Sequence, residues 1–248
     1  MSRTKKLDLI KSSYRLAALI ILISININTL SAQTAGVVRE KGGPKENGTS
    51  IRTTSISKPV FLPTVVIGTQ QWMEKNLDVM TYRNGDIIPQ VTDPTAWEAL
   101  TTGAWCWYDN SAANGAIYGK LYNWYAVNDP RGLAPQGWHI PTDAEWRTLG
   151  TLLGGDAAAG GKMTSTGITR WNSPNTSATN ESGFAGLPGA YRGTNGEFNR
   201  VGMTGLWWSA TENNSKSAWA RYLGDSRGTL IRGDSNKENG LSVRCLRD

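Results

Sequence analysis

All eleven tryptophans of this 248-residue chain lie at or after Trp72. A tryptophan carries a large apolar surface to bury, so tryptophans mark the part of a chain that forms a core. The preceding segment 33–60 contains no aromatic residue and is rich in Gly, Ser, Thr, Lys and Glu, which is typical of a flexible tether. We therefore predict one folded domain over residues 61–248.

The first 32 residues have the pattern of a secretory signal peptide. Residues 1–15 contain five basic residues and one acidic residue, and the apolar run 16–23 follows. This run is about half of the roughly 20 residues that span a bilayer. We expect cleavage after Ala32, with an uncleaved N-terminal anchor as the alternative. No cysteine near this site could accept a lipid. The expected location is exported (secreted, periplasmic or cell surface), with no transmembrane anchor after cleavage.

The net charge of +6 belongs to the segments that precede the domain. Residues 61–248 contain 16 basic and 17 acidic residues, a net charge of −1. Proteins that follow nucleic-acid phosphates need a positive surface, so we expect no nucleic-acid partner. One histidine and two cysteines cannot build a His- or Cys-rich metal centre.

The clearest helix signal begins at Thr142. Thr142 and Glu145 have the spacing of a capping box, in which each side chain accepts a hydrogen bond from the other residue's backbone N–H. Apolar residues then recur on one helical face until Gly154-Gly155 ends the helix. Other expected elements are a hairpin over 64–73, a short helix opening at Asp93-Pro94, a strand over 105–108, a helix rather than a strand over 118–127, and strands over 207–210, 218–223, 229–231 and 241–246.

Helices in the first half and an antiparallel sheet in the second half indicate the α+β class. Within this framework, capping and the helix dipole account for Asp143 and Glu145 better than acid–base catalysis does. His139 has no paired nucleophile signature, so a structural role is favoured for it as well.

Cys106 and Cys245 are the only thiols, and both lie in apolar strand contexts. An even pair in an exported protein favours a disulfide, which would close most of the domain and contribute about 5 kcal/mol. Two buried free thiols are the alternative.

Several loops are rich in oxygen-bearing side chains that calcium also uses as ligands. Turn formation explains the same residues and is favoured. We therefore expect no cofactor or metal, with calcium as the open alternative. These residues are Asp109, Asn110, Asn114, Asp225, Asp234 and Asn236.

A series of motifs in order over 64–248 resembles the Fibrobacter succinogenes major paralogous domain family. The most specific are Gly137-Trp-His-Ile-Pro-Thr-Asp-Ala-Glu-Trp146, Tyr118-Gly-Lys-Leu-Tyr-Asn-Trp-Tyr125, Trp207-Trp-Ser-Ala-Thr-Glu212 and Ser242-Val-Arg-Cys245. The family occurs in exported and surface proteins and is similar to the C-type-lectin-like fold, with short helices on a twisted antiparallel sheet and long irregular loops. It is distantly similar to formylglycine-generating enzymes.

The resemblance implies binding rather than catalysis. The related oxidases need an active-site cysteine pair, and the related iron-dependent synthases need several histidines. We expect an exported, non-catalytic domain that binds a protein or a glycan ligand. The outer late strands and long loops of such folds point to a ligand face, with Asn213, Asn214, Arg221, Arg227 and Arg232 as its residues. The alternatives are a degenerate oxidase, a polysaccharide-active enzyme and a structural component of the envelope.

Overall fold

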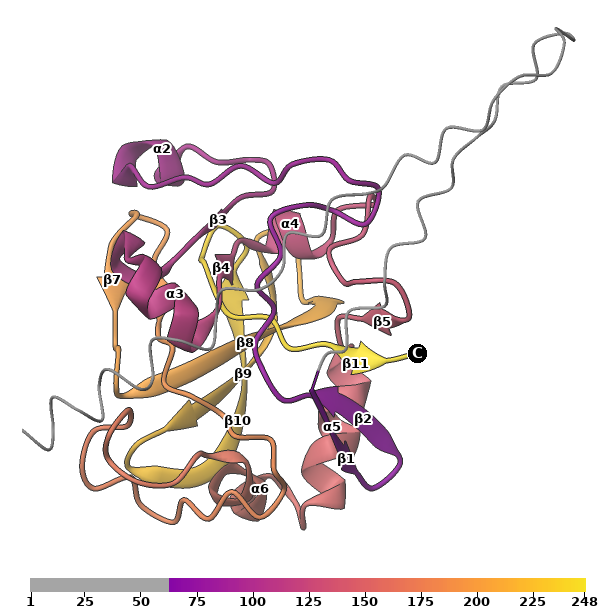
Figure 1. Cartoon of the computed structure of the whole chain (residues 1–248), viewed down its shortest axis with the longest axis vertical. Helices are drawn as coiled ribbons and strands as arrows, with labels where there is room; N and C mark the ends of the chain where they lie inside the picture. Colours follow the sequence, from indigo (N-terminus) through magenta and orange to yellow (C-terminus); the bar gives the residue numbers. More distant parts are fainter. Residues whose placement is uncertain (1–62) are drawn as a thin grey trace, which may run out of the picture. The chain divides into compact units, whose positions relative to one another are not determined.

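The protein is described over residues 63–248 by a computed structural model (Figure 1). This part of the chain has an α+β architecture with short helices and several small antiparallel sheets. The predicted signal peptide (1–32) and tether (33–60) lie outside the described residues. Within the described part, no helix is long and apolar enough to cross a membrane.

One sheet joins the beginning and the end of the described chain. Strands β1 (Thr64–Ile67) and β2 (Gln70–Met73) form the predicted hairpin, with Gly68 at a φ of +60° in its turn. Strand β11 (Leu246–Arg247) pairs with β2, and β5 (Trp138–His139) pairs with β11, which gives the order β1-β2-β11-β5. The N-terminal hairpin and the last strand of the domain therefore belong to one sheet, in which β11 pairs with β2.

The largest strands form a second, antiparallel sheet. It contains β8 (Thr204–Glu212), β9 (Ser217–Gly224) and β10 (Arg227–Asn236) in the order β10-β9-β8. Side chains of directly paired residues lie on the same face of a sheet. Arg221 pairs with Arg232 on one side and with Trp207 on the other, so these three share a face.

Helices α5 (Asp143–Leu152) and α6 (Asp156–Met163) pack against this sheet. Helix α6 lies so close to β10 that a Cβ added at Gly160 would come within 2.3 Å of the Thr229 carbonyl carbon. The glycines of 160–161 thus permit close packing, although they weaken the helical signal in the sequence, and α6 was not predicted.

Smaller elements complete the domain. They are α2 (Pro94–Glu98), η1 (Tyr108–Asn110), α3 (Ala112–Tyr118), α4 (Trp124–Val127), the pair β3 (Trp105–Cys106) and β4 (Leu121–Tyr122), and the pair β6 (Tyr191–Arg192) and β7 (Phe198–Asn199).

The prediction of one helix over 118–127 was wrong. Helix α3 ends at Tyr118 because Gly119 adopts a φ of +75°. A short strand follows, and a new helix begins where the Asn123 side chain accepts a hydrogen bond from the Ala126 N–H.

Tryptophans form much of the core, as the sequence predicts. Nine of the eleven are buried, and only Trp107 and Trp219 are partly exposed. Several buried indoles donate to main-chain carbonyls. For example, Trp105 donates to Ile88 and Trp208 donates to Tyr122. The aromatic residues therefore hold irregular segments as well as filling space.

The predicted disulfide between Cys106 and Cys245 is absent, because both cysteines are free and buried. They belong to different hydrophobic clusters. Cys106 packs with Trp97 and Leu121, whereas Cys245 lies in the cluster around Trp208. Burial raises the pKa of each thiol to about 12. The two cysteines are therefore core residues of the domain.

Candidate functional site

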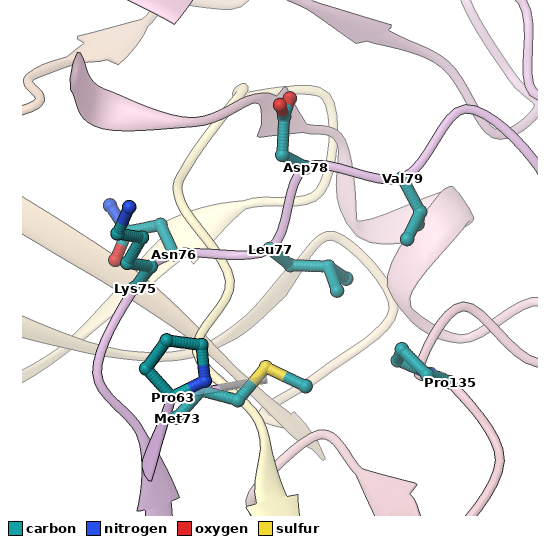
Figure 2. A pocket seen from close by; sticks show the side chains of 8 residues that line it. All are labelled: Pro63, Met73, Lys75, Asn76, Leu77, Asp78, Val79 and Pro135. Carbon is teal, nitrogen blue, oxygen red and sulfur yellow. The ribbon is translucent and has the colours of Figure 1, made fainter. Parts of the chain in front are cut away.

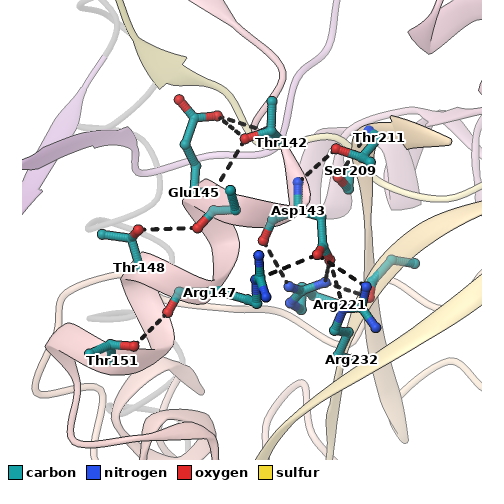
Figure 3. Close-up of polar contacts among 12 residues, drawn as sticks. Thr142, Asp143, Glu145, Arg147, Thr148, Thr151, Ser209, Thr211, Arg221 and Arg232 are labelled. Atoms are coloured by element: carbon teal, nitrogen blue, oxygen red, sulfur yellow. Dashed lines mark hydrogen bonds and ion pairs between the residues drawn. The ribbon is translucent and has the colours of Figure 1, made fainter. Parts of the chain in front are cut away.

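The capping box at the start of α5 is confirmed (Figure 3). The Thr142 hydroxyl accepts a hydrogen bond from the Glu145 N–H at 3.3 Å, and Glu145 Oε2 accepts one from the Thr142 N–H at 2.8 Å. Glu145 Oε1 lies 3.0 Å from His139 Nε2, and Asp248 Oδ1 lies 2.8 Å from His139 Nδ1. Both nitrogens of the histidine are thus occupied by carboxylates that order the helix start and the end of the chain.

The first residue of α5, Asp143, joins the helix to the sheet through two arginines (Figure 3). Its Oδ1 accepts from Arg221 Nη1 and from Arg232 Nε, both at 2.9 Å, and its Oδ2 accepts from Arg232 Nη2 at 3.1 Å. Burial alone would raise the pKa of Asp143, but the hydrogen bonds from Arg232 and Arg221 outweigh burial, and the pKa lies below its usual value. The carboxylate is therefore an ion-pair partner and not a free acid or base.

This cluster corrects the predicted ligand face. Arg221 is 1% exposed and cannot touch a ligand. Arg232 is bound to Asp143, and its guanidinium carbon lies 3.2 Å from the centre of the Trp219 ring. On a strand, charged residues at alternating positions suggest a solvated face. Here the Arg221 side chain is buried beside Asp143 of α5, and the Arg232 side chain is only partly exposed.

The other three predicted residues lie at the ends of the strands. Asn214 shapes the turn between β8 and β9, where its Oδ1 accepts from the Ser217 N–H at 3.0 Å. Asn213 donates to Asp234 Oδ2 at 3.3 Å. Arg227 is exposed at the start of β10. The five residues therefore do not form one binding surface.

Several hollows lie on the described part of the chain, among them one of about 350 Å³ beside α6. Three others are compared as ligand sites. The first has a mainly apolar lining (Figure 2), made of Pro63, Met73, Leu77, Val79 and Pro135 together with Lys75, Asn76 and Asp78. Its volume is about 220 Å³, below the range of about 300–1,000 Å³ that is usual for small-molecule sites. It is a weak candidate for a polar ligand.

A second hollow, of about 430 Å³, lies between residues 74–78, α3 and residues 183–187. Its main polar groups are already bonded within the domain. Arg244 donates through Nε and Nη2 to Asn76 Oδ1 and through Nη1 to the carbonyls of Met73 and Phe184. Asp78 is paired with Lys120. The exposed side chains of Glu74 and Lys75 also line this hollow, and within residues 63–248 they form no hydrogen bond or ion pair.

The third hollow is an open groove of about 430 Å³ on the face of the large sheet opposite Arg221. We call it the Tyr191–Tyr222 groove. It is lined by Tyr191, Arg200, Thr204, Leu206, Tyr222, Asp234, Ser235, Asn236 and Asn239.

Several hydrogen-bonding groups in this groove have no partner within the described residues. Within residues 63–248, the Tyr191 hydroxyl, the Thr204 hydroxyl and the Arg200 guanidinium form no side-chain hydrogen bond or ion pair. Asn239 donates to Ser235 Oγ at 2.8 Å, which leaves its own Oδ1 to accept. Tyr222 donates to the Asp234 carbonyl at 2.8 Å. The groove thus presents aromatic surface together with donors and acceptors that have no partner among residues 63–248.

No metal site is recognisable in the same part of the chain. Among residues 63–248, no three side chains of the His, Cys, Asp and Glu types are grouped so that they could hold an ion. Of the residues weighed for calcium, Asp234 instead accepts from Asn213, and Asn110 donates to the Thr92 carbonyl.

The architecture defines an α+β domain whose N-terminal hairpin and last strand share one sheet. The family model of the Fibrobacter succinogenes major domain matches residues 65–247. The chain belongs to that family. No curated protein and no solved structure matches the chain.

Sequence reasoning missed the groove because it is assembled from distant segments. Tyr191 lies in β6, Tyr222 lies in β9, and Asn239 follows β10. Each is a single polar or aromatic residue in a segment that contains many. The one available signal was that Tyr222 alternates with Arg221 and Leu223 in β9, which places it on the other face of the sheet.

Proposed function

We propose that this exported domain is a non-catalytic binding module that takes a carbohydrate ligand in the Tyr191–Tyr222 groove. The observation that carries the proposal is the set of uncommitted donors and acceptors beside two tyrosines in one open groove. Sugars need apolar ring surface for their C–H faces and both donors and acceptors for their hydroxyls. The groove volume of about 430 Å³ lies within the range of small-molecule sites.

The chemistry of the domain supports binding over catalysis. A retaining or inverting glycosidase needs two carboxyl groups about 5–9.5 Å apart across the sugar. On the groove, the only acidic residue is Asp234, and its carboxylate accepts from Asn213. The buried thiols have pKa values near 12 and are protonated at neutral pH. Neither group supplies a nucleophile to the groove.

We further propose that the fold is C-type-lectin-like and that the mature chain is secreted or held at the cell surface without a resident metal or cofactor. Two features support the fold proposal. The N-terminal hairpin and the last strand lie in one sheet, and the long segment between α6 and β8 contains only one short strand pair. The N-terminal signal pattern supports export.

A glycan array probed with the purified full chain tests the proposal. We expect binding that Tyr191→Ala weakens by at least about tenfold, a loss typical of a central contact residue. Tyr191→Phe isolates the contribution of the hydroxyl. Tyr125→Ala is the matched control, because Tyr125 is also partly buried but bonds to Glu238 outside the groove lining.

Each alternative function predicts a different result in these binding experiments. Release of sugar from a bound polysaccharide would replace the proposal with an enzyme. Capture of an envelope protein that persists in Tyr191→Ala would favour a protein ligand. If the folded protein binds no glycan, a structural role in the envelope would be the remaining alternative. Binding unchanged by Tyr191→Ala would refute the groove.

A further inference from the structure

The charge on the groove is set by which side chains of β10 face it. Neighbouring residues of a strand point to opposite faces. Ser235 faces the groove, because its hydroxyl accepts from Asn239, which lines the groove. Asp234 must therefore point to the other face, and its carboxylate does accept from Asn213 there. Only the main-chain carbonyl of Asp234 is turned toward the groove, where Tyr222 donates to it.

The remaining strand residues of the groove are uncharged. Leu206 pairs directly with Tyr222, and Thr204 pairs with Gly224, so Thr204, Leu206 and Tyr222 share the groove face. The groove floor thus contains hydroxyl, aromatic and aliphatic groups but no carboxylate.

Arg200 is the one charged side chain that this arrangement leaves on the groove. It is exposed, and within residues 63–248 its guanidinium has no carboxylate partner. Its backbone is fixed in the left-handed region at a φ of 68°, with its carbonyl accepting from the N–H groups of Met203 and Thr204, each at 3.1 Å. The turn that joins β7 to β8 therefore fixes the backbone of Arg200 at the groove wall, and its guanidinium has no ion-pair partner in the described part of the chain.

We infer that the Tyr191–Tyr222 groove selects sugars that carry an acidic group, and that Arg200 binds this group. The inference rests on the proposed carbohydrate function and names its ligand class. A guanidinium offers two parallel N–H donors that match a carboxylate or a sulfate. An acidic sugar would meet this charge without repulsion from the groove floor, and the neutral donors and acceptors of Tyr191, Thr204 and Asn239 would serve its hydroxyls.

Matched glycan pairs test the acidic preference with the full chain. The probes are 3′-sialyllactose against lactose, oligogalacturonate against its methyl ester, and dextran sulfate against dextran. The first two pairs isolate a carboxylate, and the third isolates a sulfate. We expect the acidic member of at least one pair to bind about tenfold more tightly at low salt, and the preference to shrink as salt rises.

Two arginine variants show whether Arg200 is responsible. Arg200→Gln should remove the preference while the protein remains folded, because the side chain is exposed. Arg227→Gln removes an equally exposed charge at the start of β10, outside the groove lining, and should leave the preference intact. Arg200→Lys should restore part of the preference, since it keeps the charge but loses the two-pronged geometry.

The outcomes separate this inference from the function on which it rests. Neutral glycans that bind as well as acidic ones, and depend on Tyr191, would refute the acidic preference but keep the carbohydrate function. An acidic preference that survives Arg200→Gln or disappears in Arg227→Gln would refute the role of Arg200. No glycan binding at all would refute both.

Discussion

Replacing Asp143 by Asn tests the ion-pair cluster that joins α5 to the large sheet. The substitution keeps the size of the side chain but removes its charge and one acceptor oxygen. Arg221, whose side chain is 2% exposed, would then be a buried cation without a counter-charge. Burial lowers the pKa of Arg221, and the hydrogen bond and the negative charge of Asp143 act against this lowering.

The expected loss follows from the exposure of the two arginines. Removing one partner of a buried pair costs about 3–5 kcal/mol. The Arg232 side chain is 35% exposed, so its half of the cluster is screened by water and adds little. Asn retains one oxygen that can accept from Arg221. We therefore expect Asp143→Asn to lower the free energy of unfolding by about 3 kcal/mol at pH 7.

The same cluster predicts a pH dependence. The pKa of Asp143 in the folded protein lies below its unfolded value. Its stabilisation is therefore complete above the unfolded value of about 3.9 and is lost as the pH falls through the lower folded value. The stability difference between the wild type and Asp143→Asn should thus shrink as the pH is lowered below about 4.

Urea denaturation followed by tryptophan fluorescence measures these differences. Asp109→Asn is the control, because Asp109 is exposed and adopts a positive φ that Asn tolerates, and it should change stability by about 0.5 kcal/mol or less. In Asp143→Asn/Arg221→Met, removal of the orphaned cation should recover much of the loss. A loss below about 1 kcal/mol, or a double variant no more stable than Asp143→Asn, would refute this account.

Two further predictions concern the helix start and the thiols. Thr142→Ala removes one half of the capping box and should lower the free energy of unfolding by about 1 kcal/mol, measured in the same urea titration; an unchanged midpoint would contradict the contribution of the cap. Cys106 and Cys245 should both be free in the exported protein and react with a thiol reagent only after unfolding. A mass lower by two hydrogens under non-reducing conditions would instead establish the bridge.

Local signals in the sequence predicted local structure well. The start of α5 could be predicted because Thr142 and Glu145 are only three residues apart. The hairpin of β1 and β2 could be predicted from the glycine in its turn. The buried ion pair of Arg221 could not be predicted, because its partner Asp143 lies 78 residues away in the sequence. The disulfide prediction failed for a similar reason, since an even number of cysteines says nothing about which cluster each one joins.

The candidate site could not be predicted from the sequence, because a buried arginine positions it through contacts between segments that are far apart in the chain. Arg192 is fully buried, and it donates to the carbonyls of Val91, Thr92 and Gly196. These bonds join the segment before α2 to the turn between β6 and β7. A guanidinium has enough donors to satisfy several carbonyls at once, which suits it to hold irregular backbone in place.

Tyr191 precedes Arg192 on β6, so the anchored arginine and the groove tyrosine alternate along one strand. Arg192 also stacks on Trp97, with its guanidinium carbon 4.5 Å from the ring centre. The side of β6 that carries Arg192 is therefore rigidly held, and this fixes the backbone from which Tyr191 reaches the groove. A groove wall that is ordered before a ligand arrives loses less conformational entropy on binding. Under the proposed carbohydrate function, the buried arginine would therefore contribute to affinity without touching the ligand. The candidate groove thus has an ordered wall even though much of the chain around it is neither helix nor strand.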